Sequence, residues 1–173
     1  MNLREHIRTI PDFPIPGIMF RDITPLLADG EALAESIAAM SRHWRDARID
    51  LVAAMEARGF IFGAAIAREL GAGFVPVRKG GKLPFTTRSV EYTLEYRNDT
   101  LYIHDDAVLP GQRVLVVDDL IATGGTARAV GQLVEMLGGV IAGYGFLVEL
   151  VDLKGREVLG GYDVRSEIEF DGE

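Results

Sequence analysis

Two adjacent carboxylates, Asp118 and Asp119, stand directly after the apolar run Val114 to Val117. A stretch of small residues soon follows, Ala122-Thr123-Gly124-Gly125-Thr126, and leads into a segment with helical periodicity. Glycines let successive backbone N–H groups converge, and a helix that begins there adds its dipole, so this loop is suited to binding an anion. Both threonines can add hydroxyl donors. No Gly-Lys-Ser/Thr sequence supports a nucleoside-triphosphate loop, so a phosphomonoester fits better.

The two acids need a different partner from the phosphate. Carboxylates accept hydrogen bonds from the vicinal hydroxyls of a sugar, and they can also hold Mg²⁺ through water. The ligand predicted by Asp118, Asp119 and the loop together is therefore a ribose 5-phosphate. One of the two acids could simply cap the following turn, but that explanation does not extend to both beside this loop.

Composition bounds the class of protein. The 173 residues are 48% hydrophobic and 25% charged, which predicts one globular domain over residues 1–173. The chain has no cysteine, which excludes disulfides and thiolate metal sites and favours an intracellular, cytoplasmic protein. A formal net charge of −8 argues against nucleic-acid binding, and no apolar run is long enough to span a membrane.

The basic residues gather in one window. From Leu70 to Val90 there is no acid, while Arg78, Lys79, Lys82 and Arg88 all fall there. Such a window in an acidic chain predicts a site for a small polyanion, and the alternative is a solvated loop that happens to be basic.

Strand and helix patterns alternate along the chain, which predicts an α/β fold with a mostly parallel sheet. We expect strands over 50–55, 73–77, 113–117, 140–150 and 162–168, helices over 31–45, 61–70 and 127–137, and a mobile hairpin within 79–100. Ligands of such sheets bind beyond the carboxyl ends of the strands, and the loop after Val117 lies at such an end.

Residues 113–127 resemble the phosphoribosyl pyrophosphate (PRPP) motif of the type I phosphoribosyltransferases. The resemblance implies that family's fold, with an N-terminal hood (about 1–30) over the base and a flexible lid (79–100). "EARGF", 56–60, resembles the family's pyrophosphate loop, which implies a cis peptide at Glu56–Ala57 and places Arg58 on pyrophosphate. Arg78, Lys79 and Lys82 would add further cations, with Arg78 able to reach across a dimer interface.

Residues 12–27 are similar to the hood of the adenine phosphoribosyltransferases, and the similarity extends over about 150 residues, from Pro11 to Gly160. It implies that Phe20 stacks on adenine while backbone groups around Met19 and Arg21 read the edge of the base. Without the resemblance, Phe20 and Ile18 would be interpreted as core residues. Glu95 in "EYTLEY" corresponds to the family's acid/base candidate, although Arg97 stands where many relatives have glycine.

The implied reaction is transfer of the 5-phosphoribosyl group from PRPP to adenine, giving AMP and pyrophosphate in purine salvage. Asp118, Asp119 and Glu95 would be the catalytic residues, Mg²⁺ the cofactor and a homodimer the assembly. Two alternatives are open: a sister enzyme for another base, which should lack the "FPIPGIMFRDI" segment, and a PRPP-sensing regulator. The acidic charge makes the regulator the weaker of these.

Overall fold

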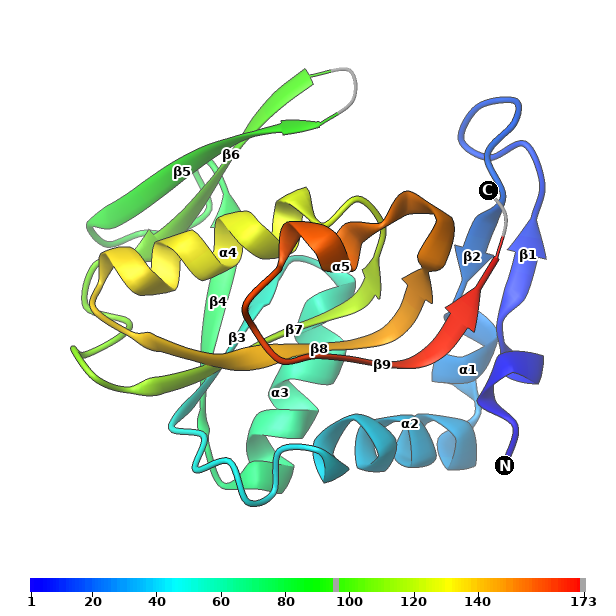
Figure 1. Cartoon of the computed structure of the whole chain (residues 1–173), viewed down its shortest axis with the longest axis horizontal. Helices are drawn as coiled ribbons and strands as arrows, with labels where there is room; N and C mark the ends of the chain where they lie inside the picture. Colours follow the sequence, from blue (N-terminus) through cyan, green and yellow to red (C-terminus); the bar gives the residue numbers. More distant parts are fainter. Residues whose placement is uncertain (95–96, 172–173) are drawn as a thin grey trace.

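The fold is a seven-stranded sheet covered by helices on both faces, with a small two-stranded sheet beside it (Figure 1). The computed structural model describes residues 1–94 and 97–171. The strand order is β5-β6-β4-β3-β7-β8-β9. The strands are β3 (Leu51–Met55), β4 (Gly73–Lys79), β5 (Thr87–Leu94), β6 (Arg97–His104), β7 (Arg113–Ile121), β8 (Val140–Leu150) and β9 (Val164–Phe170).

The sheet is mostly parallel, as the sequence predicts. Strands β4, β3, β7, β8 and β9 pair in parallel. The hairpin β5–β6 is antiparallel and joins the sheet where Arg78 and Lys79 pair with Tyr102 and Leu101. The carboxyl ends of the five parallel strands therefore meet at one edge of the molecule, where ligands of such folds bind.

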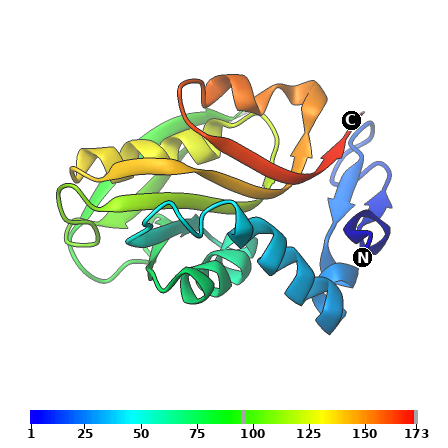
Figure 2. The same ribbon diagram turned by 60° about the horizontal axis from the view of Figure 1, so that its bottom comes forward.

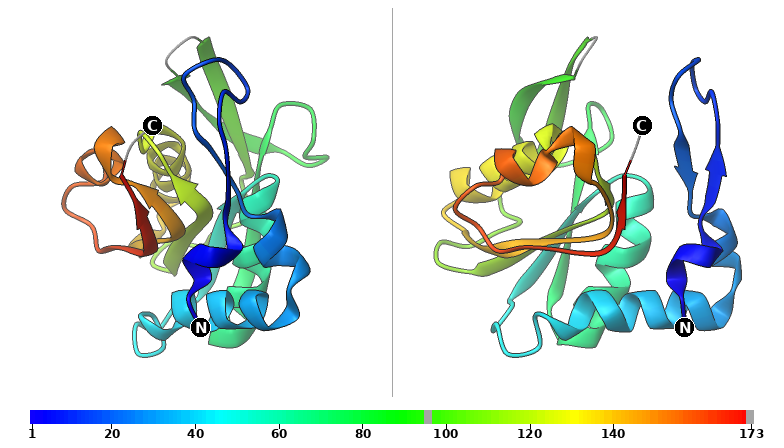
Figure 3. Two further views of the ribbon diagram at one scale, coloured as in Figure 1. Left: turned by 90° about the vertical axis from the view of Figure 1, so that its right-hand side faces the viewer. Right: turned by 45° about the vertical axis from the view of Figure 1, so that its right-hand side comes forward.

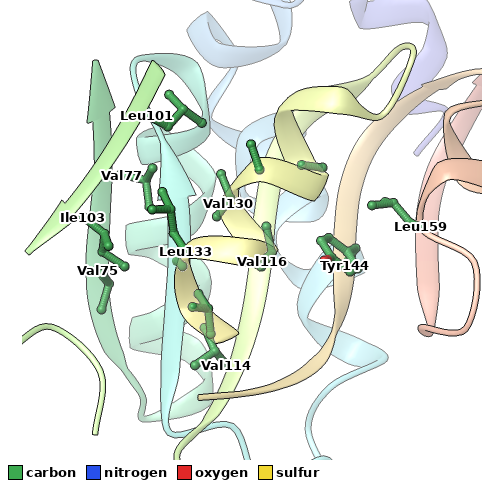
Figure 4. Close-up of a cluster of buried hydrophobic side chains, with 14 of the residues drawn as sticks. Val75, Val77, Leu101, Ile103, Val114, Val116, Val130, Leu133, Tyr144 and Leu159 are labelled. Atoms are coloured by element: carbon green, nitrogen blue, oxygen red, sulfur yellow. The ribbon is translucent and has the colours of Figure 1, made fainter. Parts of the chain in front are cut away.

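Helices α2 (Gly30–Arg42) and α3 (Arg58–Leu70) cover one face of the sheet, and α4 (Gly125–Met136) covers the other (Figure 2). Strand β7 separates two cores because its side chains alternate. Val114 and Val116 pack with the α4 side, shown in Figure 4, whereas Leu115 and Val117 pack with α2 and α3. A strand buried on both faces reads as a continuous apolar run.

The N-terminal segment forms a small unit packed on the main body, with Leu3, Ile23 and Leu26 buried in the same core as α2 and α3. It contains η1 (Leu3–His6), the antiparallel pair β1 (Arg8–Ile10) and β2 (Phe20–Asp22), and α1 (Thr24–Ala28). This unit and the β5–β6 hairpin project beyond the same end of the main sheet (Figure 3). Two short elements, η2 (Val151–Leu153) and α5 (Gly155–Val158), follow β8.

Several boundaries differ from the sequence prediction. Strand β7 does not end at Val117 but runs to Ile121, because its pairing with β8 continues past the acids. Helix α3 begins at Arg58 rather than Ile61, and α2 ends at Arg42, with Trp44 buried in the turn that follows. The hairpin strands occupy 87–94 and 97–104 rather than ending at 100. Within the described residues, no helix is long and apolar enough to cross a membrane.

Candidate active site

A cleft of about 300 Å³ opens at the carboxyl ends of β3 and β7. Two segments far apart in the sequence line it, residues 55–58 and residues 118–127. The adjacent, parallel pairing of β3 and β7 brings these segments together. The cleft therefore unites the pyrophosphate-loop candidate with the two acids and the small-residue loop, as the sequence predicts.

The small-residue loop turns directly into α4. Gly124 precedes the helix with a φ of +83°, a left-handed conformation that favours glycine. The first intrahelical bond of α4 runs from the Arg128 amide to the Gly124 carbonyl at 3.0 Å. The first amides of a helix have no intrahelical acceptor. Those at the start of α4, beside the small-residue loop, can therefore donate hydrogen bonds to an anion.

The two acids occupy different environments although they are neighbours. Asp119 is 4% exposed, and its Oδ2 lies 3.0 Å from Nε of Arg58. Asp118 accepts a hydrogen bond from the Asp119 amide at 2.8 Å. Burial raises the pKa of Asp118 well above its ordinary value, and the neighbouring charge of Asp119 raises it further. Asp118 therefore resists ionisation more than an ordinary aspartate does.

Arg58 lies at the centre of the arrangement. The peptide before it, Glu56–Ala57, is cis, as the family resemblance implies. Arg58 is the first residue of α3, so a helix rather than a free loop fixes its backbone. Its guanidinium contacts Asp119 and also lies 5.4 Å from the ring centroid of Phe20 in β2. Arg58 thus joins the cleft to the N-terminal segment.

Two of the other predicted cations, Arg78 and Lys82, lie beside Glu56, which sequence reasoning did not identify. Glu56 accepts a hydrogen bond from the Lys79 amide at 2.7 Å and another from the Lys82 ammonium, and Nε of Arg78 lies 3.7 Å away. Burial alone would raise the pKa of Glu56, but the bonds from Lys82 and Lys79 outweigh it and lower the pKa. The Lys79 ammonium lies 3.0 Å from Asp99 of β6.

The side chains of the predicted base site divide into two groups. Met19 and Phe20 are half-buried, and Phe13 contacts Phe20 edge-on at 5.1 Å between ring centroids. Ile18 is 37% exposed, so the core interpretation of that residue is wrong. The Arg21 side chain is buried: it donates to Thr9 at 2.6 Å and lies over the ring of Phe170.

Two further predictions concern the acid/base Glu95 and the Mg²⁺ site. Glu95 lies outside the described residues. In the described part of the chain, no three His, Asp or Glu side chains gather closely enough to hold a metal by themselves. Three carboxylates line the cleft, and two of them already have cationic neighbours, Glu56 beside Lys82 and Asp119 beside Arg58. They fit a Mg²⁺ ion that brings most of its oxygen ligands with it, as substrate and water.

Comparison with known proteins identifies the relatives. Residues 23–154 match the phosphoribosyl transferase domain family. The chain is 56% identical over 171 residues to the adenine phosphoribosyltransferase of Clostridium beijerinckii, covering 99% of each chain. It is 50% identical over 171 residues to that of Methanococcus maripaludis, again covering 99% of each.

Solved structures similar to this chain are also adenine phosphoribosyltransferases. The adenine phosphoribosyltransferase of Thermoanaerobacter pseudethanolicus is 56% identical and superposes with a TM-score of 0.95, covering 97% of this chain and 98% of that one. The enzyme of Saccharomyces cerevisiae, solved with a bisphosphate and adenine, is 40% identical with a TM-score of 0.91, covering 95% and 96%. Together with the cleft geometry, these similarities show that the chain belongs to the adenine phosphoribosyltransferases, transferases of the type I phosphoribosyltransferase fold.

Proposed function

We propose a role for each site residue in the family's reaction, which is the transfer of the 5-phosphoribosyl group from PRPP to adenine. The bond between C1 of the ribose and pyrophosphate breaks, a bond from C1 to N9 of adenine forms, and the N9 proton leaves. The observation that carries the proposal is the position of Arg58, which contacts Asp119 on one side and Phe20 on the other. Sugar, leaving group and base then meet around one guanidinium.

The 5-phosphate occupies the loop from Ala122 to Thr126. Backbone amides at the start of α4 donate to its oxygens, and the hydroxyls of Thr123 and Thr126 add donors. Asp118 and Asp119 accept hydrogen bonds from the 2- and 3-hydroxyls of the ribose. The sugar is then held at both ends, so that C1 can move toward the base while the phosphate stays in place.

Pyrophosphate lies near Arg58, Arg78, Lys79 and Lys82. Positive charge develops on the ribose ring in the transition state while negative charge gathers on the departing pyrophosphate. Cations placed around the leaving group stabilise that negative charge as it forms. Each of these cations has a carboxylate neighbour within the chain, so pyrophosphate takes the place of Glu56, Asp99 or Asp119 beside them.

Adenine lies against Phe20, with backbone groups of Met19 and Arg21 along its hydrogen-bonding edge. A backbone donor and acceptor distinguish adenine from 6-oxopurines, because the donor and acceptor at the 6-position are exchanged between them. The involvement of the Arg21 side chain with Thr9 and Phe170 supports readout by the backbone rather than by the guanidinium. The Saccharomyces cerevisiae relative binds adenine in its crystal structure.

Mg²⁺ belongs to this proposal as a companion of PRPP. When bound, it neutralises charge on the pyrophosphate and orients it. Asp118 and Asp119 would hold Mg²⁺ through water or through the ribose hydroxyls that donate hydrogen bonds to them. Glu95, on the lid, would take the N9 proton, and closure of residues 79–100 would keep water from attacking C1.

A homodimer completes the proposal, with the N-terminal 30 residues as hood. Arg78 contacts Glu56 of its own chain and is 34% exposed, which leaves room for a role at an interface. Light scattering at assay concentration tests the dimer, and a monomer that retains full activity would overturn it. The cytoplasmic location stays a prediction.

The experiment that tests the function offers adenine, hypoxanthine, guanine, xanthine and orotate separately, each with PRPP and Mg²⁺. Conversion of adenine alone, abolished by a chelator, is the expected result. Conversion of another base would refute the roles of Phe20 and the hood while leaving the PRPP site intact. Binding of PRPP with no conversion of any base would favour a regulator.

A further inference from the structure

A charge cluster built on one buried carboxylate lies outside the cleft, between β8, β9 and α5. Glu149 of β8 is only 5% exposed and accepts from both ends of the Arg156 guanidinium, with Nε at 3.1 Å. Ser166 of β9 donates to Glu149 at 2.5 Å and accepts from Arg156 at 3.0 Å. Arg156 also donates to the Val164 carbonyl at 2.5 Å. None of these residues has a role in the proposed chemistry.

The cluster is ionised and tightly fixed. Burial alone would raise the pKa of Glu149, but hydrogen bonds from Arg156 and Ser166 lower it. A bidentate pair between a guanidinium and a carboxylate fixes orientation as well as distance. Because the Arg156 side chain is 44% exposed, this ion pair contributes little net stability by itself, and the cluster is better explained by what it positions.

What it positions is the residue next to Arg156. Gly155 starts α5 and lies against the back of the small-residue loop: a Cβ placed on Gly155 would lie 2.2 Å from the Ala122 carbonyl oxygen and 3.0 Å from the Gly124 amide nitrogen. Conversely, a Cβ on Gly124 would lie 2.5 Å from the Gly155 carbonyl oxygen. The two backbones are in direct contact, so the position of α5 limits the conformations open to the loop.

Glu149 also reaches the loop through the sheet. It pairs in register with Ile121, the last residue of β7 before Ala122. The cluster therefore ties together the strand that ends at the loop, the backbone behind the loop and the edge strand β9. Arg156 holds α5 to β8 and β9 by its side chain while the preceding residue contacts the loop by its backbone.

We infer that Glu149, Arg156 and Ser166 are positioning residues for the 5-phosphate site, which they shape by holding Gly155 against residues 122–124. The inference rests on the proposed assignment of the phosphate to this loop. It predicts that the cluster affects ligands carrying the ribose phosphate and leaves adenine and free pyrophosphate unaffected, since those bind through Phe20 and Arg58.

The test measures KM for PRPP and for adenine, together with calorimetric Kd values for ribose 5-phosphate and pyrophosphate, in Arg156→Gln and Gly155→Ala. We expect both variants to raise the KM for PRPP and the Kd for ribose 5-phosphate, Arg156→Gln by about tenfold and Gly155→Ala by about a hundredfold, because the added methyl group must displace the Ala122 carbonyl by about 1 Å. The KM for adenine and the Kd for pyrophosphate should stay at the wild-type values. Gly155→Ala keeps the charge cluster intact, so it tests the contact even if Arg156→Gln fails to fold.

Two control variants match these changes. Arg165→Gln removes an arginine of β9 that pairs with Asp163 in an exposed position, and Gly30→Ala adds a methyl group that meets nothing within 4 Å. Both should leave the KM for PRPP unchanged. Equal rises in the KM for PRPP and adenine, or a loss of thermal stability with normal ribose 5-phosphate binding, would overturn the inference. If Thr126→Ala leaves ribose 5-phosphate binding unchanged, the phosphate assignment itself fails.

Discussion

Replacing Gly59 with alanine should lower catalysis while leaving the stability of the fold almost unchanged. Gly59 is the second residue of α3, and a Cβ there would lie 2.8 Å from Oδ1 of Asp118. That is about 0.6 Å closer than the 3.4 Å at which ordinary contact begins. The carboxylate cannot turn away freely, because the same oxygen accepts the Asp119 amide at 2.8 Å. Asp118 must therefore move within the cleft.

The size of the effect follows from that displacement. A misplacement of about 1 Å in a reacting complex costs about a hundredfold in rate, so about 0.6 Å should lower kcat/KM for PRPP by about tenfold. Stability should change little: alanine in a helix gains about 0.5–1 kcal/mol over glycine, and loss of the Asp118 hydrogen bond costs about 1 kcal/mol. The melting temperature should then stay within about 3 °C of wild type.

The assay is initial-rate formation of AMP over a range of PRPP concentrations, with thermal unfolding measured on the same preparation. Gly30→Ala is the matched control, because Gly30 opens α2 and a Cβ there meets nothing within 4 Å. A folded Gly59→Ala enzyme with wild-type kcat/KM would refute the assignment of Asp118 to the ribose. A large fall in melting temperature would show that the contact is structural.

The raised pKa of Asp118 means that the folded protein keeps this proton to a higher pH than the unfolded chain does, so unliganded stability should fall as pH rises above about 4. The free energy of unfolding of Asp118→Asn, measured in urea, should fall less with pH than that of wild type. Parallel stability–pH curves for the two proteins would contradict the burial argument. Phe20→Ala should raise the KM for adenine by about tenfold with the KM for PRPP unchanged, and equal rises would place Phe20 elsewhere. Glu95→Gln should lower kcat with little change in PRPP affinity, whereas unchanged turnover would assign the proton to solvent or another group.

The sequence predicted the cleft well where its determinants are local. Residues 118–126 form one contiguous motif, and the spacing from an apolar strand to a glycine loop allows few other arrangements. The predicted end of strand β7, at Val117, is wrong. The acids interrupt the apolar run, but the backbone of β7 stays paired with β8 past them to Ile121. Side-chain polarity reports burial, not backbone pairing, so this extension had no signal in the pattern.

The missed residues all act over long separations in the chain. Glu56 meets Lys82 across 26 positions, and Asp99 meets Lys79 only because β6 pairs with β4 in a particular register. The acid-free window was visible in the sequence, but the carboxylates that pair with it come from other elements. Gly59 and Gly155 resemble any other glycines until the packing shows what lies against them.

The pairing of the proposed pyrophosphate cations with carboxylates has a consequence for the end of the reaction. Arg58, Lys79 and Lys82 have internal anions beside them in Asp119, Asp99 and Glu56. If pyrophosphate binds these cations as proposed, it competes with acceptors that are always present at high local concentration. When pyrophosphate leaves, the carboxylate beside each cation neutralises its charge, and no counterion from solution is needed. The dependence of pyrophosphate release on salt should consequently be shallower than the number of cations around it suggests.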